Sequence, residues 1–133
     1  MDPIFENFDA VPGYELAAGV AGRALWGERA MLNLITMEPN AVVAAHSHPH
    51  EQMGIVLEGS LVLEVAGEPH EAGPRAGFVL PGGVEHSATA GPDGAVVLDI
   101  FAPVREDLAE KADLARVARA APADGAAPEQ PGR

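Results

Sequence analysis

The stretch His46-Ser47-His48-Pro49-His50-Glu51-Gln52 holds three of the five histidines of this 133-residue chain. Side chains two residues apart on an extended strand project to the same face, so His46 and His48 are expected side by side. Neighbouring imidazoles suit a first-row divalent metal. A further histidine ends the segment Pro81-Gly82-Gly83-Val84-Glu85-His86, whose turn residues deliver it at the start of a strand. The sequence therefore predicts a metal site that joins two separate segments.

These two segments resemble the paired motifs of the cupin superfamily. The first motif has two histidines separated by one residue, an acidic or amide ligand four residues on and a glycine seven further, which here are His46, His48, Gln52 and Gly59. The second is a Pro-x-Gly-x-x-His element, matched by Pro81, Gly83 and His86. The resemblance covers residues 30–101. It has two departures, since Gln52 replaces the more usual glutamate and Ala90 stands where many members have asparagine. It implies an all-β, single-domain cupin, a jelly-roll-like antiparallel β-barrel.

Composition limits the class of protein. The length suffices for one domain with a sizeable core. Without cysteine, the chain has no disulfide, thiolate ligand or cysteine nucleophile. No apolar run approaches ~18 residues and no basic leader precedes one, so we expect no membrane span, no signal peptide and a cytoplasmic location. The net charge of −12 would repel a phosphate backbone, which argues against nucleic-acid binding.

Glycine and proline recur between short Val/Ile/Leu-rich runs, a pattern typical of a barrel or sandwich of short strands. Glu58-Gly59-Ser60 predicts a tight hairpin, and Gly91-Pro92-Asp93-Gly94 predicts a second turn. We expect strands at residues 22–26, 31–37, 41–48, 52–58, 60–65, 68–71, 77–80, 85–90 and 95–101.

The expected organisation has four parts. Residues 1–29 form an N-terminal strand or arm that packs on the barrel, and residues 30–103 form the barrel itself. Residues 104–120 form a short C-terminal helix, with Glu106 and Asp107 in a first turn where they favour the helix dipole. Residues 121–133 are rich in Ala, Pro, Gly and Gln without apolar periodicity and are expected to be a disordered tail.

The ligand set bears on the chemistry of the predicted metal site. Three neutral imidazoles and the neutral Gln52 amide leave a divalent ion its full charge, which favours Lewis-acid work over oxidation. Iron oxygenases more often use two histidines and a carboxylate, so Gln52 argues against a dioxygenase. Zinc, nickel, manganese and iron all stay open. Glu51 would replace Gln52 if the register slipped by one residue. His50 is expected beside the site or in solvent, and His70 at the surface. The plain alternative is that these histidines bind no ion.

One charge interrupts the apolar run Ala95-Val96-Val97-Leu98-Asp99-Ile100-Phe101. Alternation puts Asp99 and Phe101 on the same face. A buried carboxylate costs roughly several kcal/mol unless it is paired or hydrogen-bonded. Arg105 follows the strand and is placed to reach either Asp99 or a substrate carboxylate. Two interpretations stay open, a functional trio and a barrel-closing strand in which Asp99 and Arg105 form an ion pair.

Residues 99–107, Asp-Ile-Phe-Ala-Pro-Val-Arg-Glu-Asp, resemble the C-terminal signature of the small uronate-processing cupins of pectin and alginate breakdown (KdgF-type proteins). The His-x-His-Pro-His-Glu-Gln run resembles theirs as well. This resemblance implies a metal-dependent, non-redox enzyme that converts 4,5-unsaturated uronates to their linear keto form. It implies one divalent ion on His46, His48, Gln52 and His86, and functional roles for Asp99, Phe101 and Arg105.

Two other functions stay open. One is a cyclase, isomerase or lyase of secondary metabolism on the same scaffold, and the other is a non-catalytic metal- or sugar-binding module. Whether it opens uronates or is a cyclase, isomerase or lyase, an enzyme on this scaffold would take a small anionic or oxygenated substrate. Because cupin barrels commonly pair and an open strand edge is an aggregation liability, we also expect a homodimer.

Overall fold

The computed structural model describes residues 1–120, and the tail expected at 121–133 lies outside the described residues. In this range a single eight-stranded antiparallel sheet is followed by one α-helix, which confirms the expected all-β class with a C-terminal helix. That helix is not long and apolar enough to cross a membrane. A 3-10 turn, η1 (Phe8–Ala10), precedes the sheet, and the elements that follow are β1 (Tyr14–Ala17), β2 (Val20–Trp26), β3 (Met31–Met37), β4 (Val42–His46), β5 (Glu51–Val65), β6 (Glu68–Ala72), β7 (Gly77–Leu80), β8 (His86–Ala102) and α1 (Glu106–Ala120).

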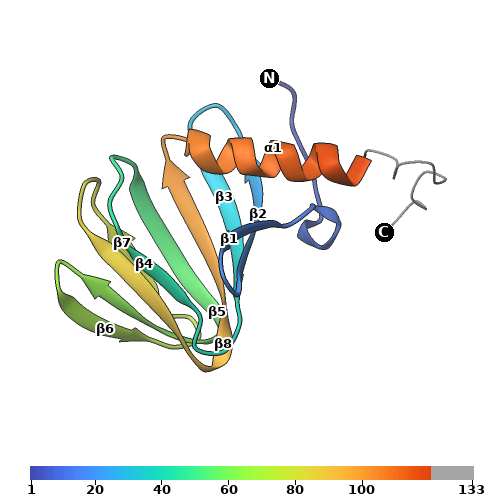
Figure 1. The fold of residues 1–133 in the computed structure, drawn as a ribbon. Coiled ribbons are helices and arrows are strands. Elements are labelled where there is room, and N and C mark those ends of the chain that lie inside the picture. The colour runs from blue at the N-terminus through green and yellow to red at the C-terminus, as the bar shows by residue number, and fades with distance from the viewer. Residues whose placement is uncertain (121–133) are drawn as a thin grey trace.

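Strands β5 and β8 form the frame of the sheet, because they pair with each other along nearly their whole length. The C-terminal half of β8 also pairs with β3, whereas its N-terminal half pairs with β4. In the same way β5 pairs with β7 near its start and with β6 near its end. The two long strands thus belong to two layers at once. Figure 1 shows the strands converging near the β5 and β8 labels and spreading apart from there.

Two glycines allow this change of layer. Gly59 in β5 and Gly94 in β8 have φ angles of 72° and 79°, a conformation that residues with a side chain rarely adopt. A Cβ atom on Gly59 would clash with the Gly94 carbonyl group. The hairpin expected at Glu58-Gly59-Ser60 and the turn expected at residues 91–94 were therefore wrong. The register shifts at this point, but the same two strands stay paired on both sides of it, so the backbone bends without reversing.

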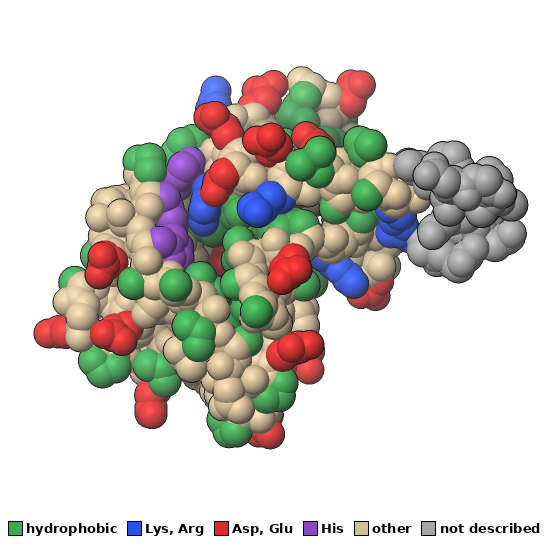
Figure 2. All heavy atoms as spheres, in the orientation of Figure 1, with side chains coloured by type: hydrophobic (Ala, Val, Ile, Leu, Met, Phe, Trp, Pro, Cys, Tyr) green, Lys and Arg blue, Asp and Glu red, His purple; other side chains and the backbone are tan. Residues whose placement is uncertain are grey.

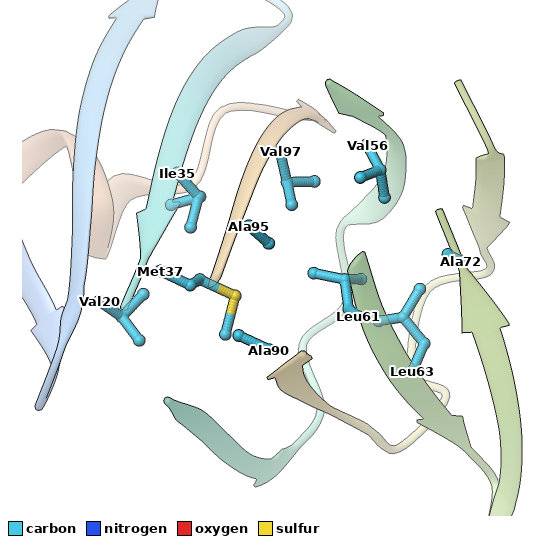
Figure 3. Packing of buried hydrophobic residues seen from close by; sticks show 10 residues of the cluster. All are labelled: Val20, Ile35, Met37, Val56, Leu61, Leu63, Ala72, Ala90, Ala95 and Val97. Atoms are coloured by element: carbon cyan, nitrogen blue, oxygen red, sulfur yellow. The ribbon is translucent and has the colours of Figure 1, made fainter. Parts of the chain in front are cut away.

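The main core lies between the two layers, and Figure 3 shows its side chains pointing toward one another. Alternate residues of each strand supply it, as the period of two requires. Its buried members are Val20, Ile35, Met37, Val56, Leu61, Leu63, Ala72, Ala90, Ala95 and Val97.

A second cluster lies under α1 and fixes the helix to the barrel. Leu108 and Ala112 of the helix are fully buried, and burial of a leucine side chain is worth about 2 kcal/mol. The strand residues of this cluster are Tyr14, Ala24, Met31 and Phe101. Leu108, in the first turn of α1, therefore packs in the same cluster as Phe101, which lies on the strand that also carries Asp99.

The outer face of the same layer is apolar as well. Met53 of β5 is the cross-strand partner of both Ile100 in β8 and Val79 in β7. Met53 and Val79 are exposed. At one edge of this face, residues 1–4 border a shallow hollow together with Leu25, Leu32 and Ile100. The N-terminal arm thus lies against the barrel and leaves Met53 and Val79 in contact with solvent.

Candidate functional site

The three motif histidines come together at one end of the barrel. His46 ends β4, His86 begins β8, and the two are register partners. His48 lies just beyond β4, not on the strand as the spacing predicted. Possible ligand atoms of the three side chains all lie within 4.8 Å of one another, which lets a single ion contact all three. Figure 2 shows histidine side chains gathered beside the start of the helix.

Backbone carbonyl groups orient all three imidazole rings. Because a carbonyl oxygen only accepts, each bonded Nδ1 carries the proton and each Nε2 keeps its lone pair. In most metal-bound histidines, a hydrogen bond from the ring nitrogen that does not bind the metal fixes the orientation of the ring in this way. The three bonds run from His46 Nδ1 to Ala44 at 2.8 Å, from His48 Nδ1 to His50 at 3.1 Å and from His86 Nδ1 to Val84 at 3.0 Å.

Gln52 adds an amide to the three histidines. Its side chain is buried, whereas Glu51 is exposed, so the one-residue slip that would exchange them does not occur. Gln52 Oε1 lies 3.1 Å from His48 Nε2. With the His48 proton on Nδ1, both of these atoms present lone pairs, an arrangement that a shared cation stabilises. The amide oxygen thus lies next to the His48 nitrogen, where it could serve as a fourth ligand.

The donor set fits a divalent ion in two further respects. His86 Nε2 is buried and has no hydrogen-bond partner among the described residues, a costly state for a ring nitrogen without a ligand. Burial lowers the pKa of both His48 and His86, and the positive charge of Arg105 acts in the same direction. Both imidazoles are thus held neutral, the form in which histidine binds metal.

The other two histidines lie outside this set. His50 is half-buried with its ring centroid 5.5 Å from that of His48, and its backbone carbonyl orients His48. His70 is exposed on β6, as expected. Neither belongs to the group of side chains that converge on one point.

A pocket next to the histidines contains all three residues of the C-terminal signature. Asp99, Phe101 and Arg105 line it together with His46, Gln52 and His86, and apolar side chains form the rest of its wall. The Phe101 ring stands edge-on to His48, with 5.7 Å between the ring centroids. The structure thus brings the seven residues singled out in the sequence into one region.

The carboxyl group of Asp99 lies in a pocket whose wall is mostly apolar. Its cross-strand neighbours are Asn33 and Gly54, and a Cβ atom on Gly54 would lie 2.8 Å from Asp99 Oδ1, so the glycine makes room for the carboxyl group. Oδ1 is buried and has no partner within the described chain. Burial raises the pKa of Asp99 to about 7, against the opposing effects of the Gln52 amide and of the Arg105 charge. Such a group can give or accept a proton near neutral pH.

Arg105 lies over Phe101 and pairs with Asp107. Its Cζ is 5.1 Å from the Phe101 ring centroid, within range of a cation–π contact. Arg105 Nη2 donates to Asp107 Oδ2 at 2.7 Å and Nε donates to Oδ1 at 3.3 Å. The alternative ion pair between Asp99 and Arg105 was therefore wrong. Asp107 offers two oxygens beside water, whereas pairing at Asp99 would take both charges out of water.

Two polar residues beside the pocket were missed in the sequence. Asn33 is fully buried on β3, lines the pocket and faces Asp99 across the strands. Burial raises the pKa of Tyr14 to about 12, although the nearby Asn33 side chain opposes this. The Tyr14 hydroxyl and both Asn33 amide atoms have no hydrogen-bond partner among residues 1–120. The available signal was one amide in the apolar run Met31-Leu32-Asn33-Leu34-Ile35, the same kind of interruption as Asp99.

The structure is thus a small antiparallel β-barrel in which three imidazoles converge beside a pocket, an arrangement that suits a single metal ion. Residues 33–101 match the cupin domain model, and the chain belongs to the cupin family.

Similar proteins support a narrower relation. The chain is 25% identical to the pectin degradation protein KdgF of Dickeya dadantii over 101 residues, which cover 74% of this chain and 92% of that protein. The solved structure of KdgF from Halomonas sp. matches with a TM-score of 0.73 and 26% identity, covering 81% of this chain and 99% of that one. The dimethylsulfoniopropionate lyase DddW of Ruegeria pomeroyi is 31% identical over 64 residues, 48% of this chain and only 42% of that protein. The expected similarity to KdgF-type cupins is confirmed.

Loss of one converging histidine should remove the metal. We expect the His86→Ala variant to bind zinc, nickel, manganese or iron at least about tenfold more weakly than the parent, because even an outer-shell contact is worth that much. The matched control is His70→Ala, since His70 is exposed and outside the group. Metal content after gel filtration, measured by mass spectrometry, checks this. Equal metal content in the two variants would contradict the assignment.

Asp99 should make the metal-free protein less stable as the pH rises. Its folded pKa of about 7 lies above its unfolded value, so the folded state binds more protons between about pH 4 and pH 7 and loses stability across this window. The Asp99→Asn variant lacks this penalty. Its gain in unfolding free energy should grow from near zero at pH 4 to on the order of 4 kcal/mol at pH 8, because each pKa unit corresponds to about 1.4 kcal/mol. Urea denaturation in the presence of a chelator measures the difference, in which the histidine titrations cancel, and a gain independent of pH would contradict this account.

Proposed function

We propose that the protein is a metal-dependent, non-redox enzyme of the lyase or isomerase type that opens 4,5-unsaturated uronates to their linear keto form. The observation that carries the proposal is the arrangement around one pocket, where a neutral set of metal ligands, the Asp99 carboxyl group and the Arg105 guanidinium group meet. The similarity to two KdgF proteins, one of them a pectin degradation protein by name, supports the choice of substrate class.

Each residue has a distinct part in this reaction. A divalent ion held by His46, His48 and His86 would supply Lewis acidity, which favours negative charge on substrate oxygens. Arg105 binds the substrate carboxylate and offsets the repulsion of an anion by a chain of net charge −12. Phe101 forms part of the pocket wall and keeps water from the reacting atoms.

Asp99 moves the proton that the reaction requires. It takes the proton from the hemiacetal hydroxyl on C1 as the bond between C1 and the ring oxygen breaks. It then returns a proton to C4, and the enol becomes the C5 ketone. The sum is an isomerisation, so no co-reactant is needed. One carboxyl group suffices, because the proton that it accepts from the C1 hydroxyl is the proton that it donates to C4.

A second candidate comes from the match to DddW, a lyase of dimethylsulfoniopropionate by name. The match covers 64 residues, and this chain spans less than half of the DddW length. The Arg105 guanidinium group suits the carboxylate of either substrate. A lyase, cyclase or isomerase reaction on another oxygenated acid is the broader alternative on the same site.

The assay that tests the proposal follows the loss of the enol-ether absorbance of 4,5-unsaturated galacturonate with the metal-loaded protein. We expect rapid loss that falls at least about 100-fold in Asp99→Asn, the usual contribution of a general acid or base. Asp93→Asn is the matched control, because Asp93 is an exposed aspartate of the same strand outside the pocket. Full activity in a metal-loaded Asp99→Asn variant would refute the mechanism. Cleavage of dimethylsulfoniopropionate instead would favour the second candidate.

We further propose a homodimer formed through the outer face that carries Met53, Val79 and Ile100. These side chains are neighbours across β7, β5 and β8; Met53 and Val79 are exposed and Ile100 is half-buried, and an exposed apolar patch on a sheet is a candidate interaction surface. A second copy of the chain is a suitable occupant, because a twofold axis brings the same apolar row from each subunit together.

Charge on this face should separate the dimer. The Met53→Glu variant is expected to sediment as a monomer at a concentration where the parent is a dimer, since the contact would bury an unpaired carboxylate. Val117→Glu is the control, because Val117 is an apolar residue that is even more exposed than Met53 and lies on α1, which is not one of the strands of this face. A parent protein that sediments as a monomer at every concentration would refute the proposal.

A further inference from the structure

Asp107 holds one edge of the Arg105 guanidinium group. Its two carboxylate oxygens accept from Nε and from Nη2 of Arg105, which is a side-on bidentate contact. Asp107 itself does not line the pocket, whereas Arg105 does. The Arg105 side chain is 13% exposed and that of Asp107 is 58% exposed, so the aspartate holds the arginine from the solvent side.

The helix fixes Asp107 in turn. Asp107 lies in the first turn of α1, where the backbone N–H groups at the start of the helix favour its carboxylate. Partial burial alone would raise the pKa of Asp107, but the hydrogen bonds and charge of Arg105, helped by the nearby backbone N–H groups, hold this pKa below its usual value. Leu108 and Ala112 anchor the same helix in the core. A chain of contacts therefore runs from the core through Asp107 to Arg105.

This contact leaves a defined part of Arg105 for a ligand. A guanidinium group has five N–H donors, and Asp107 occupies Nε and one hydrogen of Nη2. Within residues 1–120 the Arg105 guanidinium makes no other hydrogen bond. The edge formed by Nη1 and Nη2 matches the two oxygens of a carboxylate. The Phe101 ring, 5.1 Å from Cζ, limits movement on one side of the guanidinium plane.

We propose that Asp107 is a positioning residue that holds the Nη1–Nη2 edge of Arg105 ready for a substrate carboxylate and so makes the pocket selective for carboxylic acids. The choice of a uronate as the acid rests on the proposed function, but the contact itself does not. A guanidinium group held in its binding orientation loses less side-chain freedom when the ligand arrives, which strengthens binding.

The charge of Asp107 acts against carboxylate binding. The negative charge of Asp107 also lowers the attraction of Arg105 for an anion. Asp107 is more than half exposed, so water and salt screen its charge, whereas the orientation imposed by two hydrogen bonds is not screened. Orientation should therefore outweigh repulsion. The two effects predict opposite results for Asp107→Asn, which keeps one acceptor and loses the charge.

The test measures binding of D-galacturonate and D-galactose to the metal-loaded protein of residues 1–133 by calorimetry. The two sugars share their ring hydroxyls, and only the first has a carboxylate. We expect the parent to prefer galacturonate, and Asp107→Ala to weaken galacturonate binding by about fivefold to tenfold without changing galactose binding. Asp107→Asn should lose less, because its amide oxygen still accepts one bond. Asp113→Ala, an exposed aspartate on the same helix, should bind both sugars as the parent does.

Turnover separates this inference from the proposed reaction. With 4,5-unsaturated galacturonate, Asp107→Ala should raise KM by the same factor and leave kcat within about twofold, since a loss of uniform binding changes KM alone. Asp107-dependent preference for galacturonate without turnover supports the inference and refutes the proposed function. Turnover with unchanged galacturonate binding in Asp107→Ala overturns the inference alone. Tighter binding in Asp107→Asn, or a parent without preference for the acid, also overturns it.

Discussion

The pairing of β5 with β8, and its bend at Gly59 and Gly94, is the constraint on which the site depends. At one end of this ladder Gln52 pairs with Phe101, and at the other Val65 pairs with His86. In a straight ladder these ends would lie far apart. The bend turns one half of the ladder to face the other. The centroid of the His48 ring therefore lies 5.0 Å from the ring centroid of His86 and 5.7 Å from that of Phe101. The register is held tightly, because a slip of one residue would exchange the core face for the outer face.

The pocket between the two halves keeps polar atoms at a cost in stability. Asp99 Oδ1, His86 Nε2 and both amide atoms of Asn33 are buried without hydrogen-bond partners among the described residues. Each such group costs about 1–3 kcal/mol compared with a satisfied one. Such local costs are typical of functional sites, where the remainder of the fold compensates for them. Here the compensation comes from the apolar core between the layers and from the burial of Leu108 under the helix.

Much of this arrangement could be predicted from the sequence, for reasons that are local. The spacing of His46, His48 and Gln52, together with the turn before His86, indicated which residues surround the predicted metal site. Other features could not be predicted, because they depend on partners distant in sequence. Gly59 has the positive φ of a hairpin glycine, but only the continued pairing of β5 with β8 shows that it bends a strand. The choice of Asp107 over Asp99 as the partner of Arg105 depends on how the helix docks. Asn33 gave a signal as clear as that of Asp99, but no motif drew attention to it.

We propose that the bent ladder gathers three imidazole nitrogens and one amide oxygen around a single divalent ion. X-ray absorption spectroscopy of the protein loaded with zinc can decide this, because the spectrum reports the kind and number of atoms bound to the metal. We expect a first shell of three imidazole nitrogens at about 2.0–2.1 Å from the zinc, completed by oxygen. A first shell of oxygen atoms with one imidazole or none would contradict it, since the histidines would then converge without holding the ion.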